Sequence, residues 1–125
     1  MSTPAVFPRM GKVVHCRRSR FDLYIGRPFA EFPESIWANR YRIGPDGSRE
    51  DVVKQYELDT RRNLRLMAAV PDLTGLDLGC WCYPNPCHGH VLLKLVQEYW
   101  EAKLGYSMPP QGQLYVAENQ LSLFR

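Results

Sequence analysis

One segment of the sequence, residues 76–104, contains a strand, a cysteine-rich connection and a helix in direct succession. Residues 76–80 alternate leucine with other side chains, a pattern typical of a short strand. Apolar residues then recur at helical spacing from Val91 to Trp100, and Gly105 is a suitable residue to end that helix. A strand that leads into a helix is a building unit of α/β domains, so this segment predicts an α/β fold.

Two further strands are predicted near the start of the chain. The first lies within residues 12–16, around a pair of valines, and the second covers the alternating residues 21–25. Residues 28–47 then contain several prolines and glycines and predict a long irregular loop. A loop of that length in a small domain is usually functional or mobile.

A second helix is predicted after this loop. Ser48 and Asp51 match a capping box at its start, and the helix is expected to end before Pro71. The apolar residues that we expect near one face of this helix are Val52, Val53, Tyr56, Leu64 and Met67.

The order β-β-α-β-α predicts a small Rossmann-like α/β sandwich of two or three layers, with an irregular C-terminal tail. A length of 125 residues fits one domain, which we assign to residues 12–104. Residues 1–11 are expected to be a flexible leader. Residues 105–125 are expected to pack on the domain or on a partner.

Composition restricts the class of protein. A hydrophobic fraction of 45% and a charged fraction of 23% are typical of a globular domain with its own core. No apolar run approaches the roughly 20 residues that span a bilayer, and the first residues lack the pattern of a secretory signal. We therefore expect a cytoplasmic protein without membrane contact, in which cysteines bind metal or react rather than form disulfides.

Five potential soft metal ligands lie within residues 80–90. Thiolate and imidazole groups suit tetrahedral zinc, although the spacing differs from a pair of C-x2-C knuckles. Four of these ligands, or three with Cys16 if its strand is adjacent, would complete a zinc site. The candidate ligands are Cys80, Cys82, Cys87, His88 and His90.

Two other interpretations of this segment stay open. A cysteine at a helix N-terminus beside histidine is a favourable nucleophile, so Cys82 or Cys87 would act as a catalytic thiolate with His88 as base or orienting group. Alternatively, the cysteines are simply buried at the end of the strand and in the first turn of the helix, since free cysteine is often buried.

The carboxyl ends of the predicted strands are expected to form a ligand site. Ligands of open α/β sheets bind at that edge, and helix N-termini there attract anions. Arginines at the strand ends favour binding of phosphate or carboxylate, but they would also fit a solvated basic face. Tryptophans offer surfaces for a base, but the aromatic residues would also fit a role in anchoring the loop to the core. The candidate ligand-binding residues are Arg17, Arg18, Tyr24, Gly26, Arg27, Trp37, Asn39 and Trp81.

Several blocks of the sequence resemble the uncharacterised family named domain of unknown function 4326. The resemblance covers roughly residues 12–97, in the same order and spacing. Its most specific parts are the Tyr-Ile-Gly-Arg block at residues 24–27 and the Cys-x-Cys-x-Pro-x-x-Cys-His-Gly block at residues 80–89. The resemblance implies a protein of bacteriophage or bacterial origin and carries no assigned activity.

The chain departs from the family pattern at two places. The family usually has an aspartate where this chain has His90, and a Trp-Gly-Asn-Pro-Phe-like stretch where this chain has residues 37–41. If the aspartate is an acid or base in relatives, its absence favours binding without turnover. His90 would alternatively add an imidazole to a metal site.

Together these observations predict a small phage- or bacteria-encoded module that binds a nucleotide-like or phosphorylated small ligand. Such a module would act in nucleotide handling, base modification or sequestration of a nucleotide signal in the host cytoplasm, and the sequence leaves open whether it is an enzyme. The alternative is a structural zinc-binding module for protein or nucleic-acid interaction. Nucleic acid and a second copy of the chain are further partners that the sequence permits.

Overall fold

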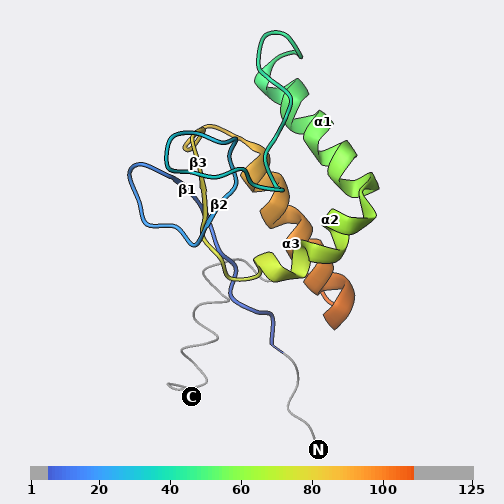
Figure 1. Cartoon of the computed structure of the whole chain (residues 1–125). Helices are drawn as coiled ribbons and strands as arrows, with labels where there is room; N and C mark the ends of the chain where they lie inside the picture. Colours follow the sequence, from blue (N-terminus) through green and yellow to red (C-terminus); the bar gives the residue numbers. More distant parts are fainter. Residues whose placement is uncertain (1–5, 109–125) are drawn as a thin grey trace, which may run out of the picture.

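Three short strands form the centre of the fold in a computed structural model that describes residues 6–108 (Figure 1). The strands are β1 (Val13–His15), β2 (Leu23–Tyr24) and β3 (Leu78–Cys80). All pairings are parallel, and β3 lies between β1 and β2. The three predicted strands are thus confirmed, each shorter than expected, and they form the sheet of a mixed α/β domain.

The sheet brings the carboxyl ends of its strands to one edge. The backbone N–H of Cys16 donates to the carbonyl of Cys80 at 3.0 Å, and that of Ile25 donates to the carbonyl of Gly79 at 3.0 Å. The residues that follow β1, β2 and β3 therefore lie side by side, as the sequence predicted.

The helical part between the loop and β3 differs from the prediction of one helix. Helix α1 (Arg49–Arg62) begins with the predicted capping box of Ser48 and Asp51. It ends at Arg62, and the side chain of the next residue, Asn63, accepts a hydrogen bond from the N–H of Leu66. Asn63 thereby caps a separate helix, α2 (Leu64–Ala69). A 3-10 turn, η1 (Val70–Leu73), follows α2. Leu64, which we expected near one face of a single helix with Val52 and Tyr56, belongs to α2 and is 83% exposed.

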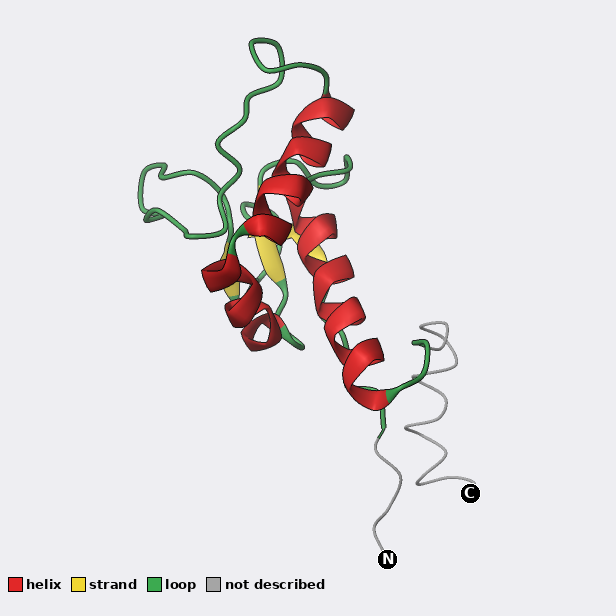
Figure 2. Ribbon diagram, turned by 90° about the vertical axis from the view of Figure 1, so that its right-hand side faces the viewer, coloured by secondary structure: helices red, strands yellow, loops and turns green. Residues whose placement is uncertain are grey.

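Helix α3 (His88–Leu104) agrees with its predicted periodicity and ends before Gly105, whose φ of 84° is left-handed. The helices lie on one face of the sheet (Figure 2). A side chain at Gly89 would place its Cβ 2.9 Å from Cγ2 of Val13 and 3.0 Å from Cδ1 of Ile25. Glycine therefore lets the first turn of α3 approach the sheet closely.

The opposite face of the sheet is covered by aromatic side chains. The Tyr24 ring stacks on that of Phe32 with centroids 4.6 Å apart, and Phe21 lies 5.9 Å from Phe32. A Cβ at Gly79 would lie 2.6 Å from the Phe21 ring, so the central strand leaves room for this ring. The loop after β2 thus takes the place of a helix on this face.

The ends of the described chain pack together. Phe7, within the segment assigned to a leader, is buried, and its ring lies edge-on to Tyr106 at 6.1 Å. Residues 1–5 and 109–125, including most of the predicted tail, lie outside the described residues. Among residues 6–108 the helices are too short or too polar to cross a membrane.

Candidate functional site

Three cysteines meet at the carboxyl edge of the sheet. The sulfur atoms of Cys80, Cys82 and Cys87 all lie within 4.8 Å of one another, and those of Cys80 and Cys87 are 3.3 Å apart. All three thiols are free, Cys80 and Cys87 are buried, and Cys82 is partly exposed. The cluster therefore has two buried members and one within reach of solvent.

Local structure accounts for this meeting. Cys80 ends β3, and a turn closed by a hydrogen bond of 2.8 Å from the N–H of Asn85 to the carbonyl of Cys82 reverses the chain. Cys87 is then the N-cap of α3, and its sulfur accepts a hydrogen bond of 3.3 Å from the N–H of Gly89. The strand end and the helix start thus present their sulfurs to one another.

The three thiols differ in acidity. Hydrogen bonds from Cys80 and Cys87, and a further one from Arg49, lower the pKa of Cys82 well below its ordinary value. Hydrogen bonding to neighbouring sulfurs raises the pKa of Cys80, through Cys82, and that of Cys87, through Cys80. The partly exposed Cys82 is therefore the most acidic of the three thiols.

The other predicted ligands have different partners. The Nε2–H of His88 donates to the carbonyl of Ile25 at 2.8 Å, and its side chain is buried. Burial lowers the pKa of His88, so its imidazole is neutral at pH 7. His90 Nδ1 accepts a hydrogen bond of 3.2 Å from the N–H of Cys87, and Cys16 lies outside the three-sulfur cluster. Of the six candidate ligands, the structure brings together three.

The cysteine cluster adjoins a cavity of about 460 Å³. Its walls come from the ends of β2 and β3, the loop before α1, and the first turns of α1 and α3. The lining residues are Gly26, Arg27, Pro28, Phe29, Asn39, Tyr41, Arg42, Ile43, Arg49, Val52, Val53, Cys80, Trp81, Cys82, Cys87 and His88.

The lining of this cavity is basic. It includes Arg27, Arg42 and Arg49 and no carboxylate. Among residues 6–108 none of these arginines forms an ion pair with an acidic residue. Arg27 donates to the carbonyl of Asn39 and Arg49 to that of Pro86, each at 3.3 Å. Three arginines therefore line the cavity without a carboxylate partner among residues 6–108.

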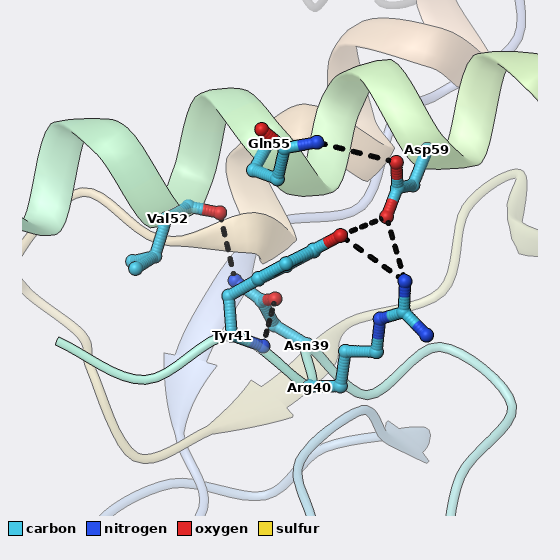
Figure 3. A network of polar contacts seen from close by, with 6 residues as sticks. All are labelled: Asn39, Arg40, Tyr41, Val52, Gln55 and Asp59. Atoms are coloured by element: carbon cyan, nitrogen blue, oxygen red, sulfur yellow. Dashed lines mark hydrogen bonds and ion pairs between the residues drawn. The ribbon is translucent and has the colours of Figure 1, made fainter. Parts of the chain in front are cut away.

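One wall of the cavity is tied to α1 by a polar network (Figure 3). The buried amide of Asn39 donates to the carbonyl of Val52 at 3.1 Å, and its oxygen accepts from the N–H of Tyr41 at 3.0 Å. The hydroxyl of Tyr41 donates to Asp59, which also pairs with Arg40. These bonds fix the backbone between Asn39 and Tyr41 and so the position of the wall.

The cavity also has an apolar and aromatic part. The ring of Trp81 is partly exposed and lies edge-on to Phe29 at 5.0 Å. Its Nε1–H donates to the hydroxyl of Tyr24 at 2.9 Å, which fixes the plane of the indole. Val52 and Val53 of α1 complete this part. The cavity therefore combines cationic groups with a surface suited to a flat ring.

Four of the predicted ligand-binding residues line the cavity: Gly26, Arg27, Asn39 and Trp81. Position 26 requires glycine for a local reason, because a Cβ there would lie 2.5 Å from the Tyr24 hydroxyl oxygen.

The other four lie elsewhere. Arg17 pairs with Glu31 at 3.0 Å, and Arg18 is exposed on the turn after β1. Tyr24 is buried and donates its hydroxyl hydrogen to the carbonyl of Arg27. Trp37 is buried in the core, where its carbonyl accepts from the Tyr56 hydroxyl at 2.8 Å. None of these four residues is part of the cavity lining.

Sequence reasoning missed two cavity arginines. Arg49 is the first residue of α1, directly after the capping serine, so the predicted helix start marked its position at a helix N-terminus. Arg42 lies in the irregular loop, where no periodicity indicates which side chains converge. The apolar residues Val52 and Val53, which we expected near one face of the helix, also line the cavity.

Comparison with known proteins finds that this chain is similar to proteins of two viruses. It is 32% identical over 98 residues to an uncharacterised 12.4 kDa protein from the nrdA-td intergenic region of Enterobacteria phage T4, covering 74% of this chain and 83% of that protein. It is 33% identical over 93 residues to uncharacterised protein R718 of Acanthamoeba polyphaga mimivirus, covering 62% of this chain and 71% of that protein. No solved structure matches the chain. The sequence pattern of the domain of unknown function DUF4326 matches residues 11–98, and the chain therefore belongs to this family.

Proposed function

We propose that this domain binds a nucleotide-like or phosphorylated small ligand in the cavity at the carboxyl edge of the sheet. The observation that carries the proposal is the set of three arginines, Arg27, Arg42 and Arg49, which line the cavity without a carboxylate partner among the described residues. Guanidinium groups bind phosphate through paired N–H donors, and an anionic ligand would neutralise the charge that they concentrate there.

The helix starts support an anionic ligand. Arg49 and His88 are the first residues of α1 and α3, and both line the cavity. Ser48 and Cys87 each cap one N–H group of these helices, and the aligned peptide dipoles favour negative charge at the same ends. Two helix N-termini beside three arginines would bind a phosphate group together.

The aromatic part of the cavity supports a ligand with a flat ring. In this proposal the rings of Trp81 and Phe29 contact a base, while the arginines hold the phosphate. We also propose that the fold is Rossmann-like, because its strands are parallel and the proposed ligand would lie at their carboxyl edge, as in that class of fold. The domain would then act in nucleotide handling, base modification or sequestration of a nucleotide signal in the infected cell.

The chemistry of Cys82 is a further part of the proposal. Its thiol lines the cavity, and its pKa is lowered by hydrogen bonds from Cys80 and Cys87. A thiolate at this place would react with an electrophilic ligand, with Cys87 and the neutral His88 in supporting roles.

A thermal-shift panel tests the binding proposal. The probes are inorganic phosphate, pyrophosphate and the common ribonucleoside mono-, di- and triphosphates. A ligand present at 100 times its Kd stabilises the protein by about 2.7 kcal/mol, which raises Tm by roughly 10 °C or more. Arg27→Gln should remove most of this rise, whereas Arg65→Gln, an exposed arginine of α2 outside the cavity, should retain it. A panel without any stabilising phosphate compound would refute the proposal.

The cysteine cluster favours a second candidate function, a structural zinc-binding module for protein or nucleic-acid interaction. Three thiols within 4.8 Å are the observation that supports it. A structural zinc ion contributes directly to folding, so chelation should unfold the purified protein. A melting curve that a chelator leaves unchanged would reject this alternative.

A further inference from the structure

The cysteine cluster offers three ligand atoms and no fourth among the described residues. Cys80, Cys82 and Cys87 are the group of possible metal ligands that the structure brings within 4.8 Å. His88 and His90, the nearest histidines in sequence, are outside this group, since neither places a ring nitrogen within 4.8 Å of all three sulfurs. Structural zinc sites have four protein ligands, whereas reactive ones have three and an open position.

The open side of the cluster faces the cavity. All three cysteines belong to the cavity lining, together with Arg27 and Arg49. Behind the cluster, Cys80 ends the central buried strand and Cys87 begins α3, and both are buried. A fourth ligand would therefore reach an ion held by the three sulfurs from the cavity.

We propose that Cys80, Cys82 and Cys87 bind one soft divalent cation of the zinc class, whose fourth coordination position opens into the arginine-lined cavity. The inference rests on the proposed function, because it adds a metal to the same ligand site. Thiolates are the ligands that soft cations prefer in proteins. A water molecule or an atom of the cavity ligand would occupy the fourth position.

The spacing of the sulfurs fits such an ion. With zinc–sulfur bonds of about 2.3 Å and tetrahedral angles, two bound sulfurs lie roughly 3.8 Å apart. The observed separations, from 3.3 Å between Cys80 and Cys87 up to the 4.8 Å limit of the cluster, bracket this value. Small rotations of the side chains would bring the three sulfurs into place without movement of β3 or α3.

The surrounding charge also fits the ion. Three thiolates and one divalent cation carry a net charge of −1, which is costly to bury without a counter-charge. Arg49 donates to the carbonyl of Pro86 at 3.3 Å and lines the same cavity as Cys82, so its guanidinium lies on the side of the cavity that holds the sulfur cluster. The same arginine would then contact the metal site and the ligand site.

Cobalt(II) titration of the metal-free protein tests the inference. We expect one Co²⁺ per chain, with sulfur-to-cobalt charge-transfer absorption and the intense visible bands of tetrahedral cobalt. Cys82→Ser should weaken Co²⁺ binding by roughly 100-fold or more, because loss of even an outer-sphere partner costs up to that factor. Cys16→Ser is the matched control, since Cys16 is a buried free cysteine outside the cluster, and it should bind Co²⁺ as the native chain does.

Addition of azide tests the open position. Azide should change the visible bands of the cobalt protein with a saturable dependence, because it enters the fourth position. Absence of Co²⁺ binding, equal binding by Cys82→Ser, or a spectrum that azide leaves unchanged would each overturn the inference. The far-ultraviolet circular dichroism of both variants confirms that they are folded.

A parallel titration separates this inference from the proposed function. Pyrophosphate binding is measured in the presence of a chelator, so that the arginines act without metal. Loss of pyrophosphate binding with normal cobalt spectra would refute the proposed ligand and leave the metal site standing. Normal pyrophosphate binding with no cobalt bands would refute the metal site alone.

Discussion

Replacement of Asn39 by alanine should loosen the wall of the cavity and destabilise the whole domain. The Asn39 amide lies between the loop and α1, where it donates to the carbonyl of Val52 and accepts from the N–H of Tyr41. The side chain is 9% exposed, so water would replace these bonds poorly. Alanine removes both bonds and leaves the N–H of Tyr41 without its acceptor.

The expected loss follows from these two bonds. Each contributes about 1 kcal/mol, and the partly buried N–H that remains unpaired raises the total to about 2–3 kcal/mol. For a domain of this size the loss corresponds to a decrease in Tm of roughly 10–20 °C. Because the carbonyl of Asn39 accepts from Arg27, the position of that arginine should also change, and ligand affinity should fall with stability.

Urea unfolding followed by circular dichroism measures the difference in free energy. Arg40→Ala is the matched control, because Arg40 belongs to the same network (Figure 3), but its side chain is 79% exposed and its ion pair with Asp59 lies in solvent. Exposed ion pairs contribute little, so this variant should unfold as the native protein does. The reasoning is refuted if Asn39→Ala loses less than about 1 kcal/mol, or if Arg40→Ala is the more damaging change.

Two further predictions concern the core and the charged surface. Leu92→Ala should cost about 2–5 kcal/mol of unfolding free energy by creating a cavity at a fully buried site, whereas Leu64→Ala, at an exposed site, should be nearly neutral in the same urea titration. Hydrogen bonds from Arg61 lower the pKa of Glu57 and of Glu98 below the ordinary value of 4.5. Both carboxylates therefore stabilise the fold above pH 4.5, and this contribution is lost as the pH falls through their lowered pKa values. Arg61→Met should therefore reduce the decrease in Tm between pH 7 and pH 3, and an equally steep decrease in the variant would contradict this assignment.

Local sequence signals predicted the elements that frame the site. The capping box of Ser48 and Asp51 is a contact between residues close in the chain, so it marks the start of α1 without knowledge of the fold. The periodicity of α3 and the end at Gly105 are local for the same reason. The rule that ligands lie at the carboxyl edge of parallel strands then placed Arg27 and the cysteines together.

Features that depend on tertiary contacts could not be predicted in the same way. Asn63 ends one helix and caps the next because its side chain prefers the backbone of Leu66, a choice that the apolar pattern around it does not indicate. The histidine ligands were chosen by their spacing in the sequence, whereas in the folded chain His88 bonds to the carbonyl of Ile25, which is distant in sequence, and is not part of the three-sulfur group. Arg42 reaches the cavity through the path of an irregular loop.

A crystal structure of the protein grown with pyrophosphate would test the central claim most directly. The account predicts the anion in the cavity, in contact with Arg27, Arg42 or Arg49 and beside the first turns of α1 and α3. Pyrophosphate bound instead at the basic turn of residues 17–20, or a cavity that remains filled by water alone at saturating pyrophosphate, would contradict it.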